Sequence, residues 1–300
     1  MTAEEEKIVR EAIAGIPAVS DFDGSIERLG GLTNQVYRIG NHVLRIPGSG
    51  TAEYINRDNE AVSAHVAAAA GVGPAVVHAD AKSGVMVTAL VPDAVTMSPE
   101  NFRTRTGSPA RAGAVLRRLH GSGGVFPFRF ELFSMIDGYL KILATKDVDL
   151  PDGYHAVVAE AESVRKALAR NPVALVPCHC DPLCENFLDD GARMWVVDWE
   201  YSGMNDPMWD LGDLSVEGAF DARQDMEMLR AYFGGEPSAA DHGRMVIYKA
   251  MCDLLWTLWG LIQHANNNPA DDFMAYALNR FARCKALMAT EEFSRHLAAV

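Results

Sequence analysis

The sequence predicts an α+β fold in two lobes, a small antiparallel-sheet N-terminal lobe and a mostly helical C-terminal lobe. The chain has 300 residues, of which 49% are apolar, and this is more core material than one compact unit usually needs. Short β-like runs are concentrated before residue 91, and segments with helical spacing dominate after residue 92. We therefore expect lobes at residues 1–91 and 92–300.

The N-terminal lobe is expected to contain a short sheet and one main helix. Residues 4–16 have apolar side chains at helical spacing and predict a first helix. Strands are predicted at 26–29, 36–39, 42–46, 75–79 and 85–90, and Gly40-Asn41 between two of these runs is a hairpin signal. The main helix is predicted over 52–70, where the glycine and proline cluster at 71–74 ends it.

The C-terminal lobe is expected to be helical with one β-like interruption. Helices are predicted at 109–120, 131–143, 154–170, 221–233, 239–265 and 271–288. The interruption comprises β-like runs at 173–178 and 194–198, and it holds the densest polar chemistry in the chain.

Composition excludes several classes of protein. The 27 basic residues against 40 acidic ones leave a net charge of −13, and no lysine or arginine run supplies the basic face that nucleic-acid binding needs. The acidic field weakly favours a cationic partner. Five cysteines are too few for a disulfide framework. The sequence shows no secretory signal and no uninterrupted apolar segment of bilayer-spanning length, so we expect a cytoplasmic protein without a membrane span.

The polar interruption has the spacing that phosphoryl transfer needs. His179-x-Asp181-x4-Asn186 precedes an Asp-Gly turn and an apolar strand that ends at Asp198. A strand–loop–strand hairpin would bring Asp181, Asn186 and Asp198 to one rim. Hard oxygen ligands of this kind suit Mg²⁺. Asp181 would then orient the attacking hydroxyl as the catalytic residue, and Asn186 and Asp198 would hold the metal against phosphate oxygens.

Two other interpretations of this segment are weaker. Each of its acidic residues taken singly is more often a turn or cap residue than a catalyst, but turn chemistry does not explain a strand that ends in a carboxylate beside a second carboxylate loop. A zinc site at Cys178, His179, Cys180 and Cys184 lacks a second ligand pair at the usual spacing. We interpret His179 and His120 as structural hydrogen-bonding residues.

The ordered set of motifs resembles the choline/ethanolamine kinase family, which is related to the aminoglycoside phosphotransferases. The resemblance rests on His179-x-Asp181-x4-Asn186 followed by Asp198-Trp199-Glu200-Tyr201, on Ser202, Asn205, Asp210-Leu211-Gly212 and Glu217, and on residues 30–34, 43–48 and Trp256-x2-Trp259. It spans about residues 26–280 in the expected order. It implies a protein-kinase-like fold with ATP between the lobes and Mg²⁺ as the metal cofactor.

The resemblance also implies where the nucleotide binds. The implied cofactor-binding residues are Gly30, Gly31, Thr33, Asn34, Arg45, Glu60, Ala89 and Val91. The glycines would let backbone amides approach phosphate oxygens. Arg45 stands where the wider kinase fold carries a lysine, and its guanidinium would bind phosphate while Glu60 fixes its direction. The backbone of residues 89–91 would meet the adenine.

The acceptor pocket is predicted around Trp256 and Trp259, which are three residues apart and share a helix face. Two indoles can wall a cage for a quaternary ammonium, at about 0.5–2 kcal/mol per ring. Glu217 would supply charge, and Tyr201 a further wall. By helical spacing alone, a tryptophan pair among leucines is more often core, whereas the resemblance favours the cage.

These observations predict an ATP- and Mg²⁺-dependent phosphotransferase that acts on a small cationic amino alcohol, choline first and ethanolamine second. The alternatives are a kinase of thiamine, an aminoglycoside or a sugar, a non-catalytic nucleotide binder, and a metal-dependent hydrolase. The sequence leaves the assembly state open, with a homodimer as one option.

Overall fold

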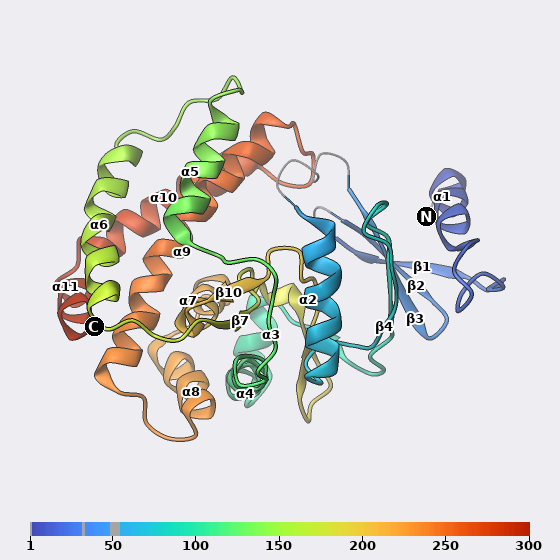
Figure 1. The fold of residues 1–300 in the computed structure, drawn as a ribbon, viewed down its shortest axis with the longest axis horizontal. Helices are drawn as coiled ribbons and strands as arrows, with labels where there is room; N and C mark the ends of the chain where they lie inside the picture. Colours follow the sequence, from blue (N-terminus) through green and yellow to red (C-terminus); the bar gives the residue numbers. More distant parts are fainter. Residues whose placement is uncertain (1, 32–33, 49–54) are drawn as a thin grey trace.

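The computed structural model describes residues 2–31, 34–48 and 55–300. The sheet of the N-terminal lobe lies at one end of the molecule, and the helices of the C-terminal lobe lie at the other (Figure 1). The two chain termini are at opposite ends. The predicted two-lobed α+β fold is confirmed.

The N-terminal lobe is built on a five-stranded antiparallel sheet. Its strands are β1 (Ile26–Gly30), β2 (Asn34–Ile39), β3 (His42–Pro47), β4 (Val76–Ala79) and β5 (Met86–Ala89), in the order β1-β2-β3-β5-β4. The predicted hairpin joins β2 to β3, where Gly40 has a φ of 56°. Such a positive φ is readily adopted by glycine.

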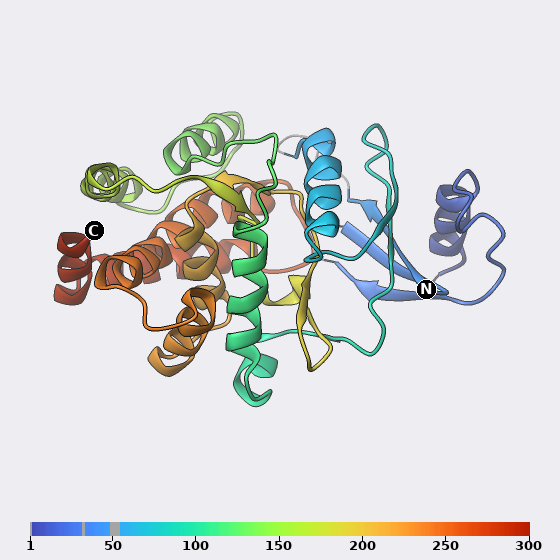
Figure 2. The ribbon, with the colours of Figure 1, turned by 60° about the horizontal axis from the view of Figure 1, so that its bottom comes forward.

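Helices cover both faces of this sheet. Helix α1 (Ala3–Ile13) buries Val9 and Ile13 against Tyr37 and Leu44 of the strands. Helix α2 (Arg57–Ala69) stands between the sheet and the C-terminal lobe (Figures 1 and 2). Because side chains alternate along a strand, Leu44 faces α1, and the neighbouring Arg45 reaches the α2 side.

The predicted start of the second helix was wrong. Residues 52–54 lie outside the described part of the chain, and residues 55–56 are not helical. Helix α2 begins at Arg57 because the Asn56 side chain accepts a hydrogen bond from the Asn59 N–H at 3.0 Å. An asparagine at this position caps the free N–H groups of the first turn.

The C-terminal lobe is mostly helical and carries two small sheets. Its helices are α3 (Pro99–Thr104), α4 (Ser108–His120), α5 (Leu132–Leu143), α6 (Tyr154–Arg170), α7 (Pro207–Glu217), α8 (Ala222–Phe233), α9 (Ala239–Ala265), α10 (Phe273–Met288) and α11 (Glu291–Ala299). Strands β7 (Val176–Cys178) and β10 (Gly203–Asn205) form one sheet, and β6 (Val95–Thr96), β8 (Phe187–Asp189) and β9 (Met194–Val196) form the other.

The sequence interpretation missed several short elements, of which α7 matters most for the site. Asp206 caps this helix and Pro207 occupies its first turn. Both polar and apolar residues of α7 are buried, including Asp210 and Asp213, so the helix has no solvent face and shows no amphipathic period. The other missed helices are α3 and α11, and the missed strands are β6, β8 and β10.

Helix α9 is the central helix of the C-terminal lobe. It is long and apolar enough to cross a membrane, with a mean hydropathy of 1.4 over its most apolar window, but 89% of that window is buried inside the protein. It packs against α5, α7, α10 and α11. Its composition is therefore accounted for by the protein core.

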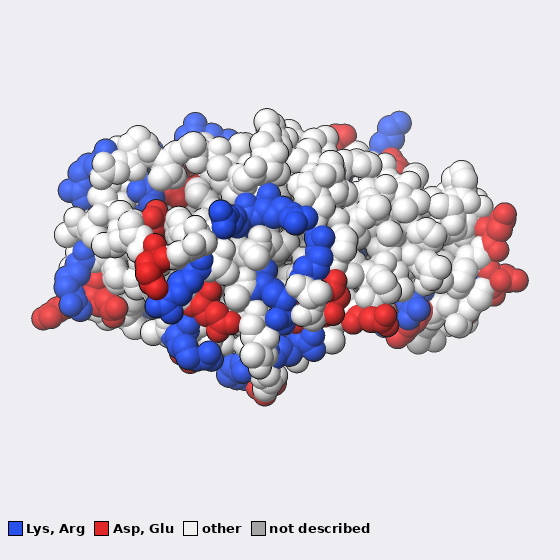
Figure 3. Space-filling model, turned by 90° about the horizontal axis from the view of Figure 1, so that it is seen from below, with Lys and Arg blue, Asp and Glu red and all other residues white. Residues whose placement is uncertain are grey.

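Charge is unevenly distributed over the surface. Lys and Arg side chains gather on the face seen in Figure 3, which is the lower side of Figure 1, where α4 lies. Two arginines near this helix, Arg105 and Arg111, are paired with the buried Asp189 at 2.8 and 2.7 Å.

Candidate active site

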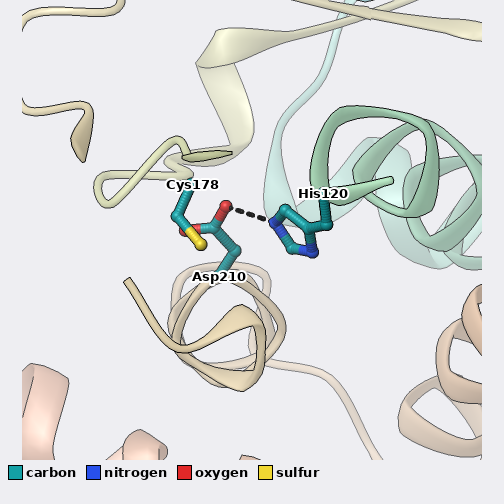
Figure 4. Close-up of side chains that lie close together, drawn as sticks. All are labelled: His120, Cys178 and Asp210. Atoms are coloured by element: carbon teal, nitrogen blue, oxygen red, sulfur yellow. Dashed lines mark hydrogen bonds and ion pairs between the residues drawn. The ribbon is translucent and has the colours of Figure 1, made fainter. Parts of the chain in front are cut away.

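Asp210 of α7 holds the loop that follows β7. Its carboxylate accepts hydrogen bonds from the backbone N–H groups of His179 at 2.7 Å and Cys180 at 2.8 Å. It is also hydrogen-bonded to the His120 ring at 3.0 Å (Figure 4). Cys180 has a φ of 68°, a backbone conformation that needs such support in a residue other than glycine. The loop that presents Asp181 is thus anchored from α7 and α4.

The cluster of His120, Cys178 and Asp210 has ligand atoms within 4.8 Å of one another, but it is better explained as a hydrogen-bond network (Figure 4). Both oxygens of Asp210 already accept backbone N–H groups. Burial raises the pKa of the Cys178 thiol well above its usual range, and Asp210 raises it further. A protonated thiol is a poor metal ligand.

The three oxygen-bearing side chains of the predicted metal and catalytic set lie on neighbouring segments. The Asn186 side-chain N–H donates to the Asp181 carbonyl at 3.0 Å. The Val197 N–H donates to the Asn186 carbonyl at 3.0 Å, and Asp198 follows with a φ of 67°. His179 supports the same turn through a hydrogen bond of its ring to the Val197 carbonyl at 2.9 Å.

Asp181 lies in a strongly acidic environment. Burial raises its pKa well above the usual range, and the carboxylates of Asp213, Glu217 and Asp198 raise it further. Burial also raises the pKa of Asp198, although the Arg45 guanidinium opposes the rise. A nearby cation would stabilise the charged forms of these carboxylates and lower their pKa values.

Arg45 of β3 joins the two lobes through ion pairs. It pairs with Glu60 of α2, and its Nη1 lies 3.3 Å from both Asp198 and Glu200. Arg57 at the start of α2 pairs with Glu60 at 2.8 Å and with Glu200 at 3.1 Å. All five side chains are buried or partly buried. Two arginines therefore pair with three carboxylates at the junction of the lobes, which leaves an excess of negative charge there.

Sequence reasoning assigned no role to Glu200 or Arg57. The signal for Glu200 was its position two residues after Asp198, at the end of the same segment. Arg57 could not have been found from spacing, because the predicted helix start placed it inside the second turn instead of at the first position.

The glycine segment between β1 and β2 is only partly described. Gly31 has a φ of 110°, and a Cβ there would meet the Asn34 carbonyl at 1.9 Å, so this turn requires glycine. Gly30 has a φ of 149° and open space around it. Asn34 donates to Glu200 at 3.1 Å and so reaches the acidic cluster. Thr33 lies outside the described residues.

The segment between the lobes leaves part of its backbone available for hydrogen bonding. The Ala89 N–H donates to the Ala75 carbonyl at 2.8 Å, and the Leu90 N–H donates to the Asn41 carbonyl at 2.9 Å. The Val91 backbone enters no hydrogen bond with the described residues. A flat ligand with edge donors and acceptors could therefore pair with this segment.

An aromatic cluster lies on α9, α10 and the segment after Asp198. The Trp259 indole N–H donates to the Tyr201 hydroxyl at 2.8 Å, and the rings of Tyr201 and Trp256 are 5.3 Å apart in edge contact. The Trp259 ring also contacts Phe273 at 5.5 Å and Tyr276 at 5.7 Å. The structure therefore brings together Trp256, Trp259 and Tyr201, the three predicted aromatic residues.

Sequence reasoning missed two members of this region, Tyr276 and Arg280. They are four residues apart on α10, and the Arg280 guanidinium lies over the Tyr276 ring, 4.6 Å from its centroid. Arg280 also forms an ion pair with Glu217. Glu217 is therefore near the cluster as expected, but part of its charge is balanced by a side chain that the sequence did not point to.

The described donor set fits Mg²⁺. The Asn186 amide N–H is used by Asp181, which leaves the Asn186 side-chain oxygen as a hard donor. Asp198 and its neighbours Glu60 and Glu200 bring carboxylate oxygens within 4.8 Å of one another. Oxygen-only donor sets suit Mg²⁺ and disfavour soft metals.

Comparisons with known proteins agree with this arrangement. A family model described as "Phosphotransferase enzyme family" matches residues 25–245. LicA of Haemophilus influenzae is 30% identical over 250 residues, which is 79% of this chain and 90% of that protein. The crystal structure of choline kinase LicA from Streptococcus pneumoniae is 28% identical, with a TM-score of 0.81 over 96% of this chain and 99% of that one, and LicA has also been solved in complex with AMP.

A more similar solved structure is that of a choline/ethanolamine kinase family protein from Mesorhizobium loti. It is 67% identical to this chain, with a TM-score of 0.91, and the match covers 98% of each chain. The chain thus belongs to the phosphotransferase enzyme family and, within it, to the choline/ethanolamine kinases.

Proposed function

We propose that this phosphotransferase uses ATP and Mg²⁺ to phosphorylate the hydroxyl of a small cationic amino alcohol, choline first and ethanolamine second. The observation that carries the proposal is the position of Asp181. The Asn186 side chain donates to the Asp181 backbone carbonyl, and the Asp181 carboxylate interacts electrostatically with Asp198, with Glu217 and with Tyr276 of the aromatic cluster. A phosphoryl donor and a cationic acceptor would therefore meet at Asp181.

In the proposed reaction, the acceptor oxygen forms a bond to the γ-phosphorus as the bond from that phosphorus to the β–γ bridging oxygen of ATP breaks, and ADP leaves. The acceptor proton passes to the Asp181 carboxylate late, because the transition state of phosphoryl transfer is loose. Asn186 and Asp198 would hold Mg²⁺, which when bound neutralises charge on the phosphate oxygens. The raised pKa of Asp181 suits a group that must accept a proton.

We place the nucleotide against the N-terminal lobe. Gly30, Gly31, Thr33 and Asn34 would face the phosphates with Arg45, whose direction depends on its ion pair with Glu60. The backbone from Ala89 to Val91 would meet the adenine, and the Val91 N–H and C=O groups, which form no hydrogen bond with the described residues, support this. The relative LicA has been solved in complex with AMP, which supports nucleotide binding by this chain.

We place the acceptor against Trp256, Trp259, Tyr201 and Glu217, and we add Tyr276. A methylated ammonium offers no hydrogen-bond donors, so aromatic faces and nearby carboxylates are the groups that can hold it. The cluster supplies both. Curated relatives named ethanolamine kinase 1 and 2 and the choline kinase LicA make these two amino alcohols the first acceptors to test.

The test is ADP release from the purified protein with saturating ATP and Mg²⁺, with and without each acceptor. The panel contains choline, ethanolamine, thiamine, kanamycin and glucose. Choline- or ethanolamine-dependent ADP release supports the proposal, and release with another acceptor only identifies a different kinase. Release that needs no acceptor indicates a hydrolase, and no release with any acceptor indicates a nucleotide binder.

Three remaining expectations belong to this proposal. We place the lobe boundary between residues 91 and 92, since β5 ends at Ala89 and the next strand, β6, pairs with β8 of the C-terminal lobe. A homodimer stays a prediction, and light scattering of the purified protein tests it. A cytoplasmic location also stays a prediction, and cell fractionation tests it.

A further inference from the structure

Asp213 is a buried carboxylate beside the aromatic cluster that the proposed chemistry does not use. It lies on α7, its side chain is fully buried, and its Oδ2 accepts the Trp256 indole N–H at 3.1 Å. Its Oδ1 has no hydrogen-bond partner among the described residues. The thiol of Cys252, a weak donor, interacts with the same carboxylate.

The other carboxylates of this region are balanced by arginines. Glu217 forms an ion pair with Arg280. Asp253 accepts hydrogen bonds from Arg280 at 3.1 Å and from Arg283 at 3.0 Å. Neither arginine donates a hydrogen bond to Asp213 in the described residues. Apart from Asp181, which would meet the acceptor hydroxyl, Asp213 is therefore the carboxylate of this cluster without a paired cation.

The hydrogen bond to Trp256 does not by itself explain a charged residue at this position. A neutral amide oxygen would accept the indole N–H equally well. A buried carboxylate costs more to desolvate than an amide, unless a cation compensates it. The cation that the proposed function brings to this cluster is the ammonium group of the acceptor.

We propose that Asp213 is a positioning residue that selects cationic acceptors, because it holds the Trp256 indole in place and contributes a second negative charge behind the aromatic wall. This inference rests on the proposed function and deepens it. Glu217, which the sequence favoured as the counter-charge, forms an ion pair with Arg280, whereas Asp213 contacts Trp256 directly and interacts with Arg280 only electrostatically.

The electrostatics of the cluster support this role. Burial raises the pKa of Asp213 well above its usual range, and Glu217 and Asp210 raise it further, whereas Arg280 and the Trp256 hydrogen bond lower it. The other titratable groups that interact with it are Asp181, Cys180, Cys252 and Tyr276. A bound cation favours the charged carboxylate, so acceptor binding and ionisation of Asp213 assist each other.

The test compares an acceptor with its uncharged isostere, in which carbon replaces the ammonium nitrogen. We would measure KM and kcat for choline and for 3,3-dimethylbutan-1-ol, using the inhibition constant of the latter if it is not phosphorylated. Asp213→Asn keeps an oxygen for the Trp256 N–H and removes the charge. We expect KM for choline to rise about tenfold with kcat nearly unchanged, because the lost interaction stabilises the bound substrate and the transition state equally. The KM or inhibition constant of the neutral alcohol should stay within about twofold of its wild-type value.

Asp225→Asn is the matched control. Asp225 is a buried carboxylate of α8 that pairs with Lys249 and accepts a hydrogen bond from Ser215 at 2.5 Å, away from the aromatic cluster. In this variant, the ratio of the constant for choline to the constant for its neutral isostere should be the same as in the wild type. If the Asp213→Asn protein does not fold, Asp213→Ser is measured instead. The ratio of the constants measured for the two acceptors on one preparation does not depend on the fraction of protein that is active.

Two outcomes overturn the inference. If the constants for choline and for the neutral alcohol rise equally in Asp213→Asn, Asp213 only supports the shape of the pocket. If neither constant changes, Asp213 has no role in acceptor selection. Failure of the proposed function is distinguished from both, because the wild-type protein would then release no ADP in response to any amino alcohol.

Discussion

The Arg45 guanidinium lies 3.3 Å from the Asp198 carboxylate, although 153 positions separate the two residues in the chain. Arg45 comes from the third strand of the N-terminal sheet, and Asp198 follows β9 of the C-terminal lobe. The contact places the proposed phosphate-binding residue against the proposed metal ligand. Both would act on the same phosphate oxygens, so the lobes must keep their relative position for either to work.

The first prediction concerns the direction of Arg45. Glu60→Gln removes the charge of its partner on α2, and we expect KM for ATP to rise about tenfold because the guanidinium loses its fixed orientation. Steady-state kinetics with varied ATP measures this. Arg38→Ala is the control, since Arg38 lies exposed on the neighbouring strand. An ATP KM that is the same in Glu60→Gln and wild type would contradict the proposed role.

The second prediction concerns Asp181. Asp181→Asn should lower kcat about 10²- to 10⁴-fold, the range expected for loss of a positioned proton acceptor. Nucleotide affinity should stay close to that of the wild type, as measured by titration calorimetry. Asp190→Asn, in the exposed turn between β8 and β9, is the matched control and should be fully active. Turnover at a near wild-type rate in Asp181→Asn would refute the assignment.

The third prediction concerns the metal. Chelation of Mg²⁺ by EDTA should abolish phosphoryl transfer, and added Mg²⁺ should restore it. Asp198→Ala should weaken ATP binding in the presence of Mg²⁺ by about tenfold or more, while affinity measured without Mg²⁺ changes less. Calorimetric titrations with and without the metal separate these effects. Equal Mg²⁺-dependent affinity in both proteins would argue against metal ligation by Asp198.

The fourth prediction concerns the aromatic wall. Trp259→Leu keeps an apolar side chain but removes the ring, and it should raise KM for choline about 5- to 30-fold, as expected for loss of a cation–π contact. Trp195→Leu is the control, because Trp195 lies on β9 with Arg193 over its ring. Acceptor kinetics provide the measurement. A choline KM that responds equally to both substitutions would speak against a cage at Trp259.

The fifth prediction concerns acid stability. Burial raises the pKa of Asp189, but hydrogen bonds from Arg111 and Arg105 outweigh this effect and leave the pKa below its usual value. Because the folded-state pKa is depressed, this carboxylate stabilises the fold above its unfolded pKa of about 3.9, and the contribution is lost as pH falls through the folded pKa.

Urea unfolding between pH 7 and pH 3 measures that contribution. Asp189→Asn should lower the free energy of unfolding at pH 7 by about 3 kcal/mol, because two arginines lose a buried partner, and the difference from the wild type should shrink at low pH. Asp190→Asn serves as control, since the neighbouring Asp190 is exposed. A stability difference that does not change with pH would contradict the electrostatic explanation.

Local patterns predicted the main elements well where one face of an element is solvated. The amphipathic helices α4, α5 and α8 and the β2–β3 hairpin agree with the predicted ranges within one or two residues. Burial alone did not hide a helix, because the mostly buried α9 was predicted with its observed bounds, Ala239–Ala265. Helix α7 was missed because it is short and buries polar and apolar residues alike, which leaves no amphipathic period to detect. The start of α2 was misplaced because a cap residue, not the apolar pattern, decides where a helix begins.

The sequence by itself determined the fold class and the face shared by Trp256 and Trp259, and it predicted the chemistry proposed for Asp181, Asn186 and Asp198. Those inferences depend on residue type and short spacing, which are local properties. Only the tertiary structure decided that Glu217 is paired with Arg280, that Glu200 joins the Arg45 cluster, and that Asp213 forms no ion pair with the described residues. Ion pairing depends on distances between segments far apart in the chain. Packing of α7, α9 and α10 sets these distances around Asp213 and Glu217, and the position of β3 and α2 against the segment after β9 sets them around Arg45 and Glu200.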